Sequence, residues 1–350
     1  MVRPSVRRTA RGRRMKRAGV RSREIEALVR CCRDQAAAAE RGNRIAVFEN
    51  GVQWDPLIAL ARRHGMLSQL YRSLRGPAWR LVPETAAASL TSAYRINLVR
   101  GLGLLRELIR LLGVLGAADV RALPLKGPAL AVQVFGDPAA RVFHDLDLLV
   151  PASDLAVAVR QLGRAGYCPE VAMEASAAAF FVRRESCLGL RHRRTGQTVE
   201  LHWNYLPLCF RQPIDFEALW RDRRSLAVAG RSVAALPDRE NARFLCLHGF
   251  KHGWDRLSLV CDLAGFLGGT PVAGLAVDRP IAAGLLLAGS LLPGTIGAAQ
   301  AGACRAHAVA VPLARRWGRR LCGAAPPARA LLATPAEYAV APGGVRAARG

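Results

Sequence analysis

Two aspartates separated by one residue, Asp145 and Asp147, are the clearest candidates for chemistry in this sequence. They lie in the run FHDLDLLV, residues 143–150, whose apolar flanks predict a short buried strand. Because side chains alternate along a strand, both carboxylates would point to one face while Leu146 points into the core. Two such carboxylates repel each other, and a divalent cation between them removes that cost. Hard oxygen ligands of this kind suit Mg²⁺, and substrate phosphates would supply further ligands to the ion.

A third carboxylate, Glu200, lies in a second alternating segment, residues 198–203. A glutamate inside an apolar strand is costly unless it is paired or bound to a metal ion. If this strand lies beside the aspartate strand, Glu200 completes a cluster that holds two ions. One ion would position a triphosphate, and the other would lower the pKa of an attacking hydroxyl. The alternative is an ion pair with Arg191, Arg193 or Arg194, and spacing alone does not decide between the two.

Residues upstream of the aspartates could contact phosphate groups. Lys126 and Gly127 follow a predicted strand, residues 120–125, and the Lys126 ammonium could contact a triphosphate as a point charge. The alternative is a surface lysine at the end of a strand. Arg141 could clamp a phosphate, or it could pair with Asp137.

Two histidines, His248 and His252, are spaced four residues apart in a predicted helix and would share one face. Such a pair could bind zinc. No glutamate lies between them in the pattern of zinc proteases, and no third ligand is evident. We therefore expect them to line the core or an acceptor pocket.

Helical segments precede and follow the predicted strands. We expect a basic, disordered tail over residues 1–34, a helical region over 35–115 and a mixed-sheet core over 116–210. A C-terminal helical region, 211–350, is poorly defined after residue 268. This order predicts an α+β fold, with a small mixed β-sheet flanked by N- and C-terminal helical regions.

The net charge of +25 predicts a surface that attracts nucleotides or nucleic acid. Only three of the 51 basic residues are lysines, so codon bias contributes part of the arginine excess. Residues 1–23 carry ten basic residues and no acidic one. We expect a solvated tail, with a weak nucleic-acid contact as the alternative. Translation could begin at Met1 or at Met15.

The nine cysteines show no C-x-x-C spacing, so the sequence does not support a zinc ribbon or a thioredoxin-type site. Their odd number, without a secretory signal, predicts a reducing cytoplasm and free, mostly buried thiols. Residues 281–304 are uncharged and long enough to span a bilayer. They are rich in Ala and Gly and contain Pro293, so we expect a packed helix followed by a loop and no membrane contact.

Several short motifs together resemble a known family. They are Leu125-Lys126-Gly127, residues 135–138, Arg141, residues 145–150, Gly166-Tyr167 and residues 200–203, with Trp54-Asp55, Ala61 and His64-Gly65 upstream and His248, Lys251-His252 and Asp262 downstream. This combination resembles the uncharacterised nucleotidyltransferase family of the polymerase-beta-like superfamily. The resemblance implies a nucleotidyltransferase fold in which Asp145, Asp147 and Glu200 bind metal. The wider superfamily usually has a Gly-Ser turn before the aspartate pair, which holds the phosphates. In this sequence Lys126-Gly127-Pro128 stands in that place.

The resemblance implies an enzyme that uses Mg²⁺, in a two-ion site, to move a nucleoside monophosphate from a nucleoside triphosphate such as ATP to an acceptor hydroxyl. Pyrophosphate would be released. The acceptor, a small molecule, a protein or an RNA, is not identified by any motif. The alternatives are a non-catalytic nucleic-acid-binding protein and an inactive nucleotidyltransferase-fold interaction protein.

Overall fold

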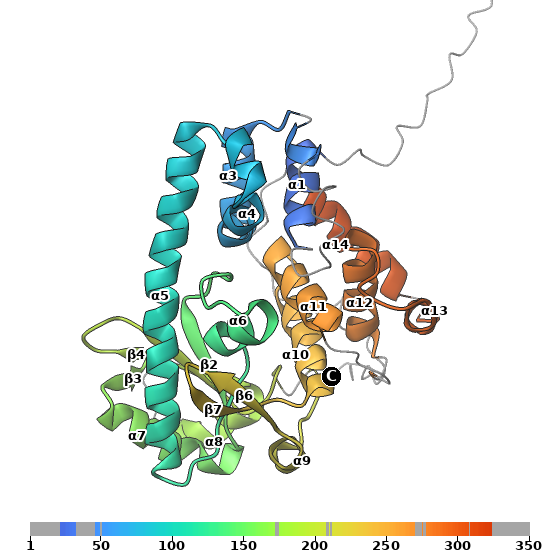
Figure 1. Ribbon diagram of the computed structural model, residues 1–350. Helices are drawn as coiled ribbons and strands as arrows, with labels where there is room; N and C mark the ends of the chain where they lie inside the picture. The colour runs from blue at the N-terminus through green and yellow to red at the C-terminus, as the bar shows by residue number, and fades with distance from the viewer. Residues whose placement is uncertain are drawn as a thin grey trace, which may run out of the picture.

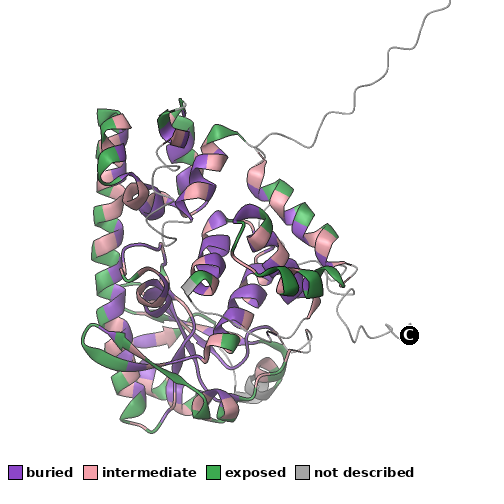
Figure 2. Ribbon diagram, turned by 45° about the vertical axis from the view of Figure 1, so that its right-hand side comes forward, coloured by how far each residue is buried: buried purple, intermediate pink, exposed green. Residues whose placement is uncertain are grey.

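The computed structural model describes residues 22–32, 46–49, 51–171, 175–207, 210, 212–269, 275, 278–307 and 309–323. Within these ranges the chain is an α+β protein, as predicted: a small mixed sheet is surrounded by helices (Figure 1). Figure 2 shows buried residues on the helix faces that turn towards the centre of the molecule.

None of the helices in the described ranges combines the length and the apolar character that a bilayer span requires.

A five-stranded sheet with the order β1-β2-β5-β4-β3 forms the core of the middle region. Its strands are β1 (Leu123–Pro124), β2 (Asp145–Leu149), β3 (Tyr167–Pro169), β4 (Cys187–His192) and β5 (Thr198–His202). β2 and β5 run parallel, whereas the other neighbouring pairs are antiparallel. The hairpin of β4 and β5 therefore lies beside the aspartate strand, which is the arrangement that a role for Glu200 required. The predicted strand over residues 120–125 is only two residues long.

The N-terminal helices pack against one another. They are α1 (Arg23–Cys31), α3 (Trp54–Arg63), α4 (Leu67–Leu74) and α5 (Glu84–Gly116). α5 follows Pro83 and has Glu84 in its first turn, a proline and an acidic residue that both favour the start of a helix. Its 33 residues span roughly 50 Å, and Figure 1 shows it along one whole side of the molecule. Leu104, Leu108 and Leu115 of α5 are buried.

The remaining helices cover the sheet and build the C-terminal region. They are α6 (Gly127–Phe135), α7 (Leu155–Arg164), α8 (Ala175–Arg184), α9 (Phe216–Arg221), α10 (Asp238–Lys251), α11 (Leu257–Gly269), α12 (Arg279–Leu291), α13 (Ala298–Arg305) and α14 (Ala310–Cys322). A separate two-stranded ribbon, β6 (Arg224–Val228) and β7 (Arg231–Ala235), was not predicted. The uncharged stretch 281–304 contains most of α12, a loop and most of α13, so a packed helix followed by a loop is confirmed and a second helix was missed.

The predicted disordered tail, residues 1–34, is wrong for the part that the structure describes. The Ser22 hydroxyl accepts a hydrogen bond from the Ile25 backbone N–H and caps α1, whose Ile25 and Leu28 are buried. The basic charge of the segment masked this amphipathic helix. Residues 1–21, which carry the predicted nucleic-acid contact, lie outside the described residues.

A disulfide joins Cys32, at the end of α1, to Cys261 in α11, which corrects the expectation of free thiols. The two cysteines are 229 residues apart, so no local spacing could reveal the pair. Cys168, Cys187, Cys246 and Cys304 are free thiols. The expectation of a cytoplasmic location relied partly on free thiols, and the disulfide removes that support.

Reduction of the Cys32–Cys261 disulfide should lower the free energy of unfolding by about 2–5 kcal/mol. The bond closes a long loop and so restricts the unfolded chain. Urea unfolding with and without excess dithiol measures the change, and a Cys32→Ala, Cys261→Ala chain is the control that should not respond. An equal shift in that control would contradict the assignment of the effect to this bond.

Candidate metal and nucleotide site

The strand register brings the three predicted carboxylates together. β2 and β5 pair so that Asp147 lies opposite Glu200, and Asp145 lies two residues earlier on β2. Asp145, Asp147 and Glu200 each offer a carboxylate oxygen, and these atoms lie within 4.8 Å of one another. Leu146 and Leu148, which alternate with the aspartates, are buried in the core. The three carboxylates therefore lie close together, as the sequence predicted.

The buried carboxylate of Asp147 is the centre of this cluster. Its Oδ1 atom lies 3.2 Å from Lys126 Nζ and 3.1 Å from His202 Nε2. Its Oδ2 atom is buried and has no hydrogen-bond partner among the described residues. A buried carboxylate oxygen without a partner costs free energy, and a cation would satisfy it. The oxygen donors and this unsatisfied atom fit Mg²⁺.

The pKa values of Asp145 and Asp147 are shifted in opposite directions. Burial alone raises the pKa of Asp147, but Lys126 and the hydrogen bond with His202 hold the pKa well below its usual range. Burial and the charge of Asp147 raise the pKa of Asp145, although Lys126 opposes the effect. A cation beside Asp145 would oppose both effects and favour its charged form.

Lys126 is mostly buried beside the carboxylates, so the alternative of a surface lysine is wrong. Its side chain is 13% exposed, and Nζ lies 3.8 Å from Asp145 Oδ2. Burial disfavours its ammonium, but Asp147, Asp145 and Glu200 outweigh burial and raise the pKa of Lys126. Three carboxylates and one ammonium leave two formal negative charges, which one divalent cation would balance.

Gly127 holds Lys126 close to β2. Its φ of 65° is in the left-handed region, where glycine carries no steric cost. A Cβ atom there would lie 3.4 Å from the backbone oxygen of Asp145. The Lys-Gly sequence thus places α6 directly against the carboxylate strand.

His202 was missed by the sequence prediction. Its Nε2 atom lies 3.2 Å from Glu200 Oε2 as well as 3.1 Å from Asp147 Oδ1. Burial lowers the pKa of His202, but the contacts with Asp147 and Glu200 reverse this and raise it. Strand alternation was the available signal, since residues 200 and 202 share a face.

The partner of Glu200 is a histidine, so an arginine pair is not what stabilises it. The His202 hydrogen bond lowers the pKa of Glu200 against the effect of burial. Arg191 instead pairs with Glu170, with 2.6 Å between Nη2 and Oε1.

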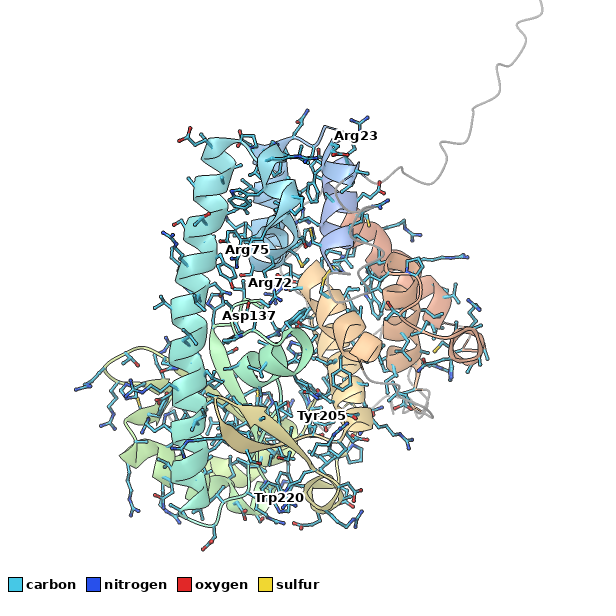
Figure 3. All side chains as sticks on the ribbon, viewed as in Figure 1. Arg23, Arg72, Arg75, Asp137, Tyr205 and Trp220 are labelled. Carbon is cyan, nitrogen blue, oxygen red and sulfur yellow. A yellow bond between two sulfur atoms is a disulfide. The ribbon has the colours of Figure 1, made fainter. Side chains whose placement is uncertain are left out.

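Arg141 is buried, but its ionic partner is not the predicted alternative, Asp137. Arg141 Nε donates to Asp262 Oδ2 of α11 at 2.7 Å. Asp137 Oδ2 accepts from Arg72 and Tyr94, each at 3.0 Å, and Figure 3 shows Asp137 beside Arg72. The Nη1 atom of Arg141 is buried and has no hydrogen-bond partner among the described residues.

His248 and His252 lie at the end of α10, with ring centroids 4.6 Å apart. Burial and then the charge of Lys126 lower the pKa of His252 to about 4, and the pKa of His248 is also well below its usual value. Both rings are therefore neutral at pH 7. In the described part of the chain, no cluster of three metal-ligating groups includes them, so the zinc alternative still lacks its third ligand.

Comparison with known proteins assigns the family. The model of the uncharacterised nucleotidyltransferases matches residues 50–273. The chain belongs to this family, and the resemblance drawn from its motifs is confirmed. It is thus a member of a nucleotidyltransferase family.

Two solved structures show a weak likeness to this chain. A lincomycin-bound lincosamide antibiotic adenylyltransferase, LnuA, is 15% identical with a TM-score of 0.32, over 47% of this chain and 97% of its own. An antigenic nucleotidyltransferase-like protein from Paracoccidioides brasiliensis is 16% identical with a TM-score of 0.33, over 63% of this chain and 91% of its own. No curated protein sequence matches the chain.

Replacing Lys126 with methionine should have opposite effects on the affinity of the chain for Mg²⁺ and on its affinity for nucleotide. Without the ammonium, the carboxylates should bind Mg²⁺ alone about tenfold more tightly, whereas nucleoside triphosphate should bind about tenfold more weakly. Calorimetric titration with each ligand measures both affinities. Arg160→Met, an exposed change on α7, should alter neither. Weaker binding of both ligands would contradict a role of Lys126 as the counter-charge of the carboxylates.

Proposed function

We propose that this chain transfers a nucleoside monophosphate from a nucleoside triphosphate to an acceptor hydroxyl, in a reaction that depends on Mg²⁺ and releases pyrophosphate. The observation that carries the proposal is the cluster of Asp145, Asp147 and Glu200 on parallel strands, in which one buried carboxylate oxygen has no hydrogen-bond partner among the residues that the structure describes. Family membership supports the reaction class.

The three carboxylates would hold the metal. When bound, Mg²⁺ would neutralise phosphate charge and lower the pKa of the attacking hydroxyl. The cluster with Lys126 has two formal negative charges, enough for one ion. A second ion, as predicted from the sequence, would therefore enter with the negatively charged triphosphate.

Lys126 and Arg141 would contact the phosphates. Lys126 is already held at the cluster, and Arg141 is fixed by Asp262 through Nε while its Nη1 atom has no hydrogen-bond partner in the described part of the chain. The acceptor oxygen would form a bond to the α-phosphorus, the bond from that phosphorus to the β-phosphate oxygen would break, and Glu200 would accept the hydroxyl proton. The contribution of the protein is mainly positioning and charge neutralisation.

The acceptor is best sought directly. The chain is incubated with each nucleoside triphosphate, labelled on the α- or the γ-phosphate, together with Mg²⁺ and cell extract. We expect the α-label in a protein, RNA or small-molecule product, and the γ-label in pyrophosphate. The Asp145→Asn, Asp147→Asn chain should form neither. Transfer of the γ-label to the acceptor, or equal labelling by the double variant, would overturn the proposal.

A further inference from the structure

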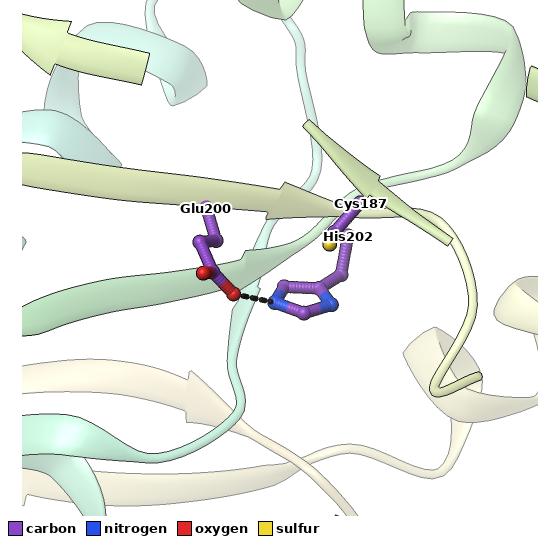
Figure 4. Close-up of side chains that lie close together, drawn as sticks. All are labelled: Cys187, Glu200 and His202. Carbon is purple, nitrogen blue, oxygen red and sulfur yellow. Dashed lines mark ion pairs between the residues drawn. The ribbon is translucent and has the colours of Figure 1, made fainter. Parts of the chain in front are cut away.

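A second set of ligand atoms lies beside the three carboxylates. Cys187, Glu200 and His202 each offer one ligand atom, and these atoms lie within 4.8 Å of one another. Cys187 begins β4 and pairs directly with His202 of β5. Figure 4 shows the Cys187 and Glu200 side chains converging on the His202 ring. The proposed transfer reaction gives Cys187 no role.

The donor atoms of this set differ from those of the aspartate cluster. A thiolate sulfur, an imidazole nitrogen and a carboxylate oxygen together suit Zn²⁺ or a similar transition metal and do not suit Mg²⁺. Three protein ligands with a fourth position open to water or substrate are the pattern of catalytic zinc sites. The chemistry of the set therefore points to a different ion.

The hydrogen bonding of His202 also leaves room for a cation. Its side chain is 5% exposed, and its Nε2 atom contacts two carboxylate oxygens, which a single N–H cannot satisfy equally. Its Nδ1 atom is buried without a hydrogen-bond partner among the described residues. A buried ring nitrogen without a partner is costly, and metal ligation through Nδ1 would satisfy it while the Nε2 N–H donates to a carboxylate.

We propose that Cys187, His202 and Glu200 form a second divalent-cation site that takes a thiophilic ion such as Zn²⁺. The site adjoins the proposed magnesium site and shares Glu200 with it. Its occupancy does not require nucleotidyl transfer, so the two proposals can fail separately. Because Glu200 is shared, binding of an ion in one site changes the affinity of the other.

Cobalt is the probe that tests this site. Co²⁺ replaces Zn²⁺ in such sites, and a thiolate bound to it gives a sulfur-to-metal charge-transfer band in the near ultraviolet. We expect one equivalent of Co²⁺ to produce this band in the full chain, and Zn²⁺, but not Mg²⁺, to remove it. The band should be lost in Cys187→Ser and kept in Cys168→Ser, which changes a partly buried free thiol on β3.

Two further variants keep the test decisive. Asp145→Asn should lose Mg²⁺-dependent transfer and keep the cobalt band, which separates this site from the proposed function. His202→Asn should weaken Co²⁺ binding at least tenfold, with thermal unfolding as the check that each variant is folded. Absence of the band in the wild-type chain, or its survival in Cys187→Ser, would overturn the proposal.

Discussion

The Asp147→Asn variant should transfer nucleotide about 10³-fold more slowly than the wild-type chain. The buried carboxylate of Asp147 contacts Lys126 and His202 through Oδ1. Its Oδ2 atom has no hydrogen-bond partner among the described residues. An amide in its place removes one negative charge from the cluster and is a poor ligand for Mg²⁺. The rate of pyrophosphate release, measured with the acceptor fraction identified by labelling, gives the effect.

Asp222→Asn is the matched control for this change. Asp222 is an exposed aspartate whose ionic partner is Arg221, and the same substitution there should leave the rate within a factor of two. Circular dichroism should show that both variants are folded. A rate for Asp147→Asn within tenfold of the wild type would show that this carboxylate is not a metal ligand.

Breaking the Arg141–Asp262 ion pair should lower the free energy of unfolding by about 3–5 kcal/mol. Its two side chains are 8% and 2% exposed, so an Arg141→Leu change leaves a buried carboxylate without its counter-charge. Burial already raises the pKa of Asp262 despite Arg141, which shows that the pair does not fully offset the cost of burying the carboxylate. Urea unfolding measures the loss.

The double variant Arg141→Leu, Asp262→Leu makes this prediction specific. Removing both charges removes the desolvation cost as well, so the double variant should recover at least half of the stability lost by Arg141→Leu. The exposed pair Arg221–Asp222 should contribute less than about 1 kcal/mol. A double variant as unstable as the sum of the two single variants would contradict this account of the buried pair.

Local periodicity was sufficient to predict the carboxylates. Alternation in residues 143–150 placed Asp145 and Asp147 on one face, and alternation in residues 198–203 placed Glu200 on another strand. Each inference needed only neighbouring residues, and the strands β2 and β5 formed where it predicted them. The roles of these residues in binding metal stay predictions until they are measured.

Contacts between distant segments could not be predicted in this way. The partner of Arg141 lies 121 residues away on α11, and the partner of Cys32 lies 229 residues away on the same helix. The end of the uncharged stretch 281–304 was predicted as a loop and contains most of α13, which was missed because Ala and Gly give a weak apolar periodicity.

Calorimetric titration of a nucleoside triphosphate, with and without Mg²⁺, tests the central claim most directly. The wild-type chain should bind the nucleotide at least about tenfold more tightly when Mg²⁺ is present, because the carboxylates would hold the ion against the phosphates. The Asp145→Asn, Asp147→Asn chain should show no such gain. Equal Mg²⁺-dependent binding by both chains would contradict a metal site at Asp145, Asp147 and Glu200.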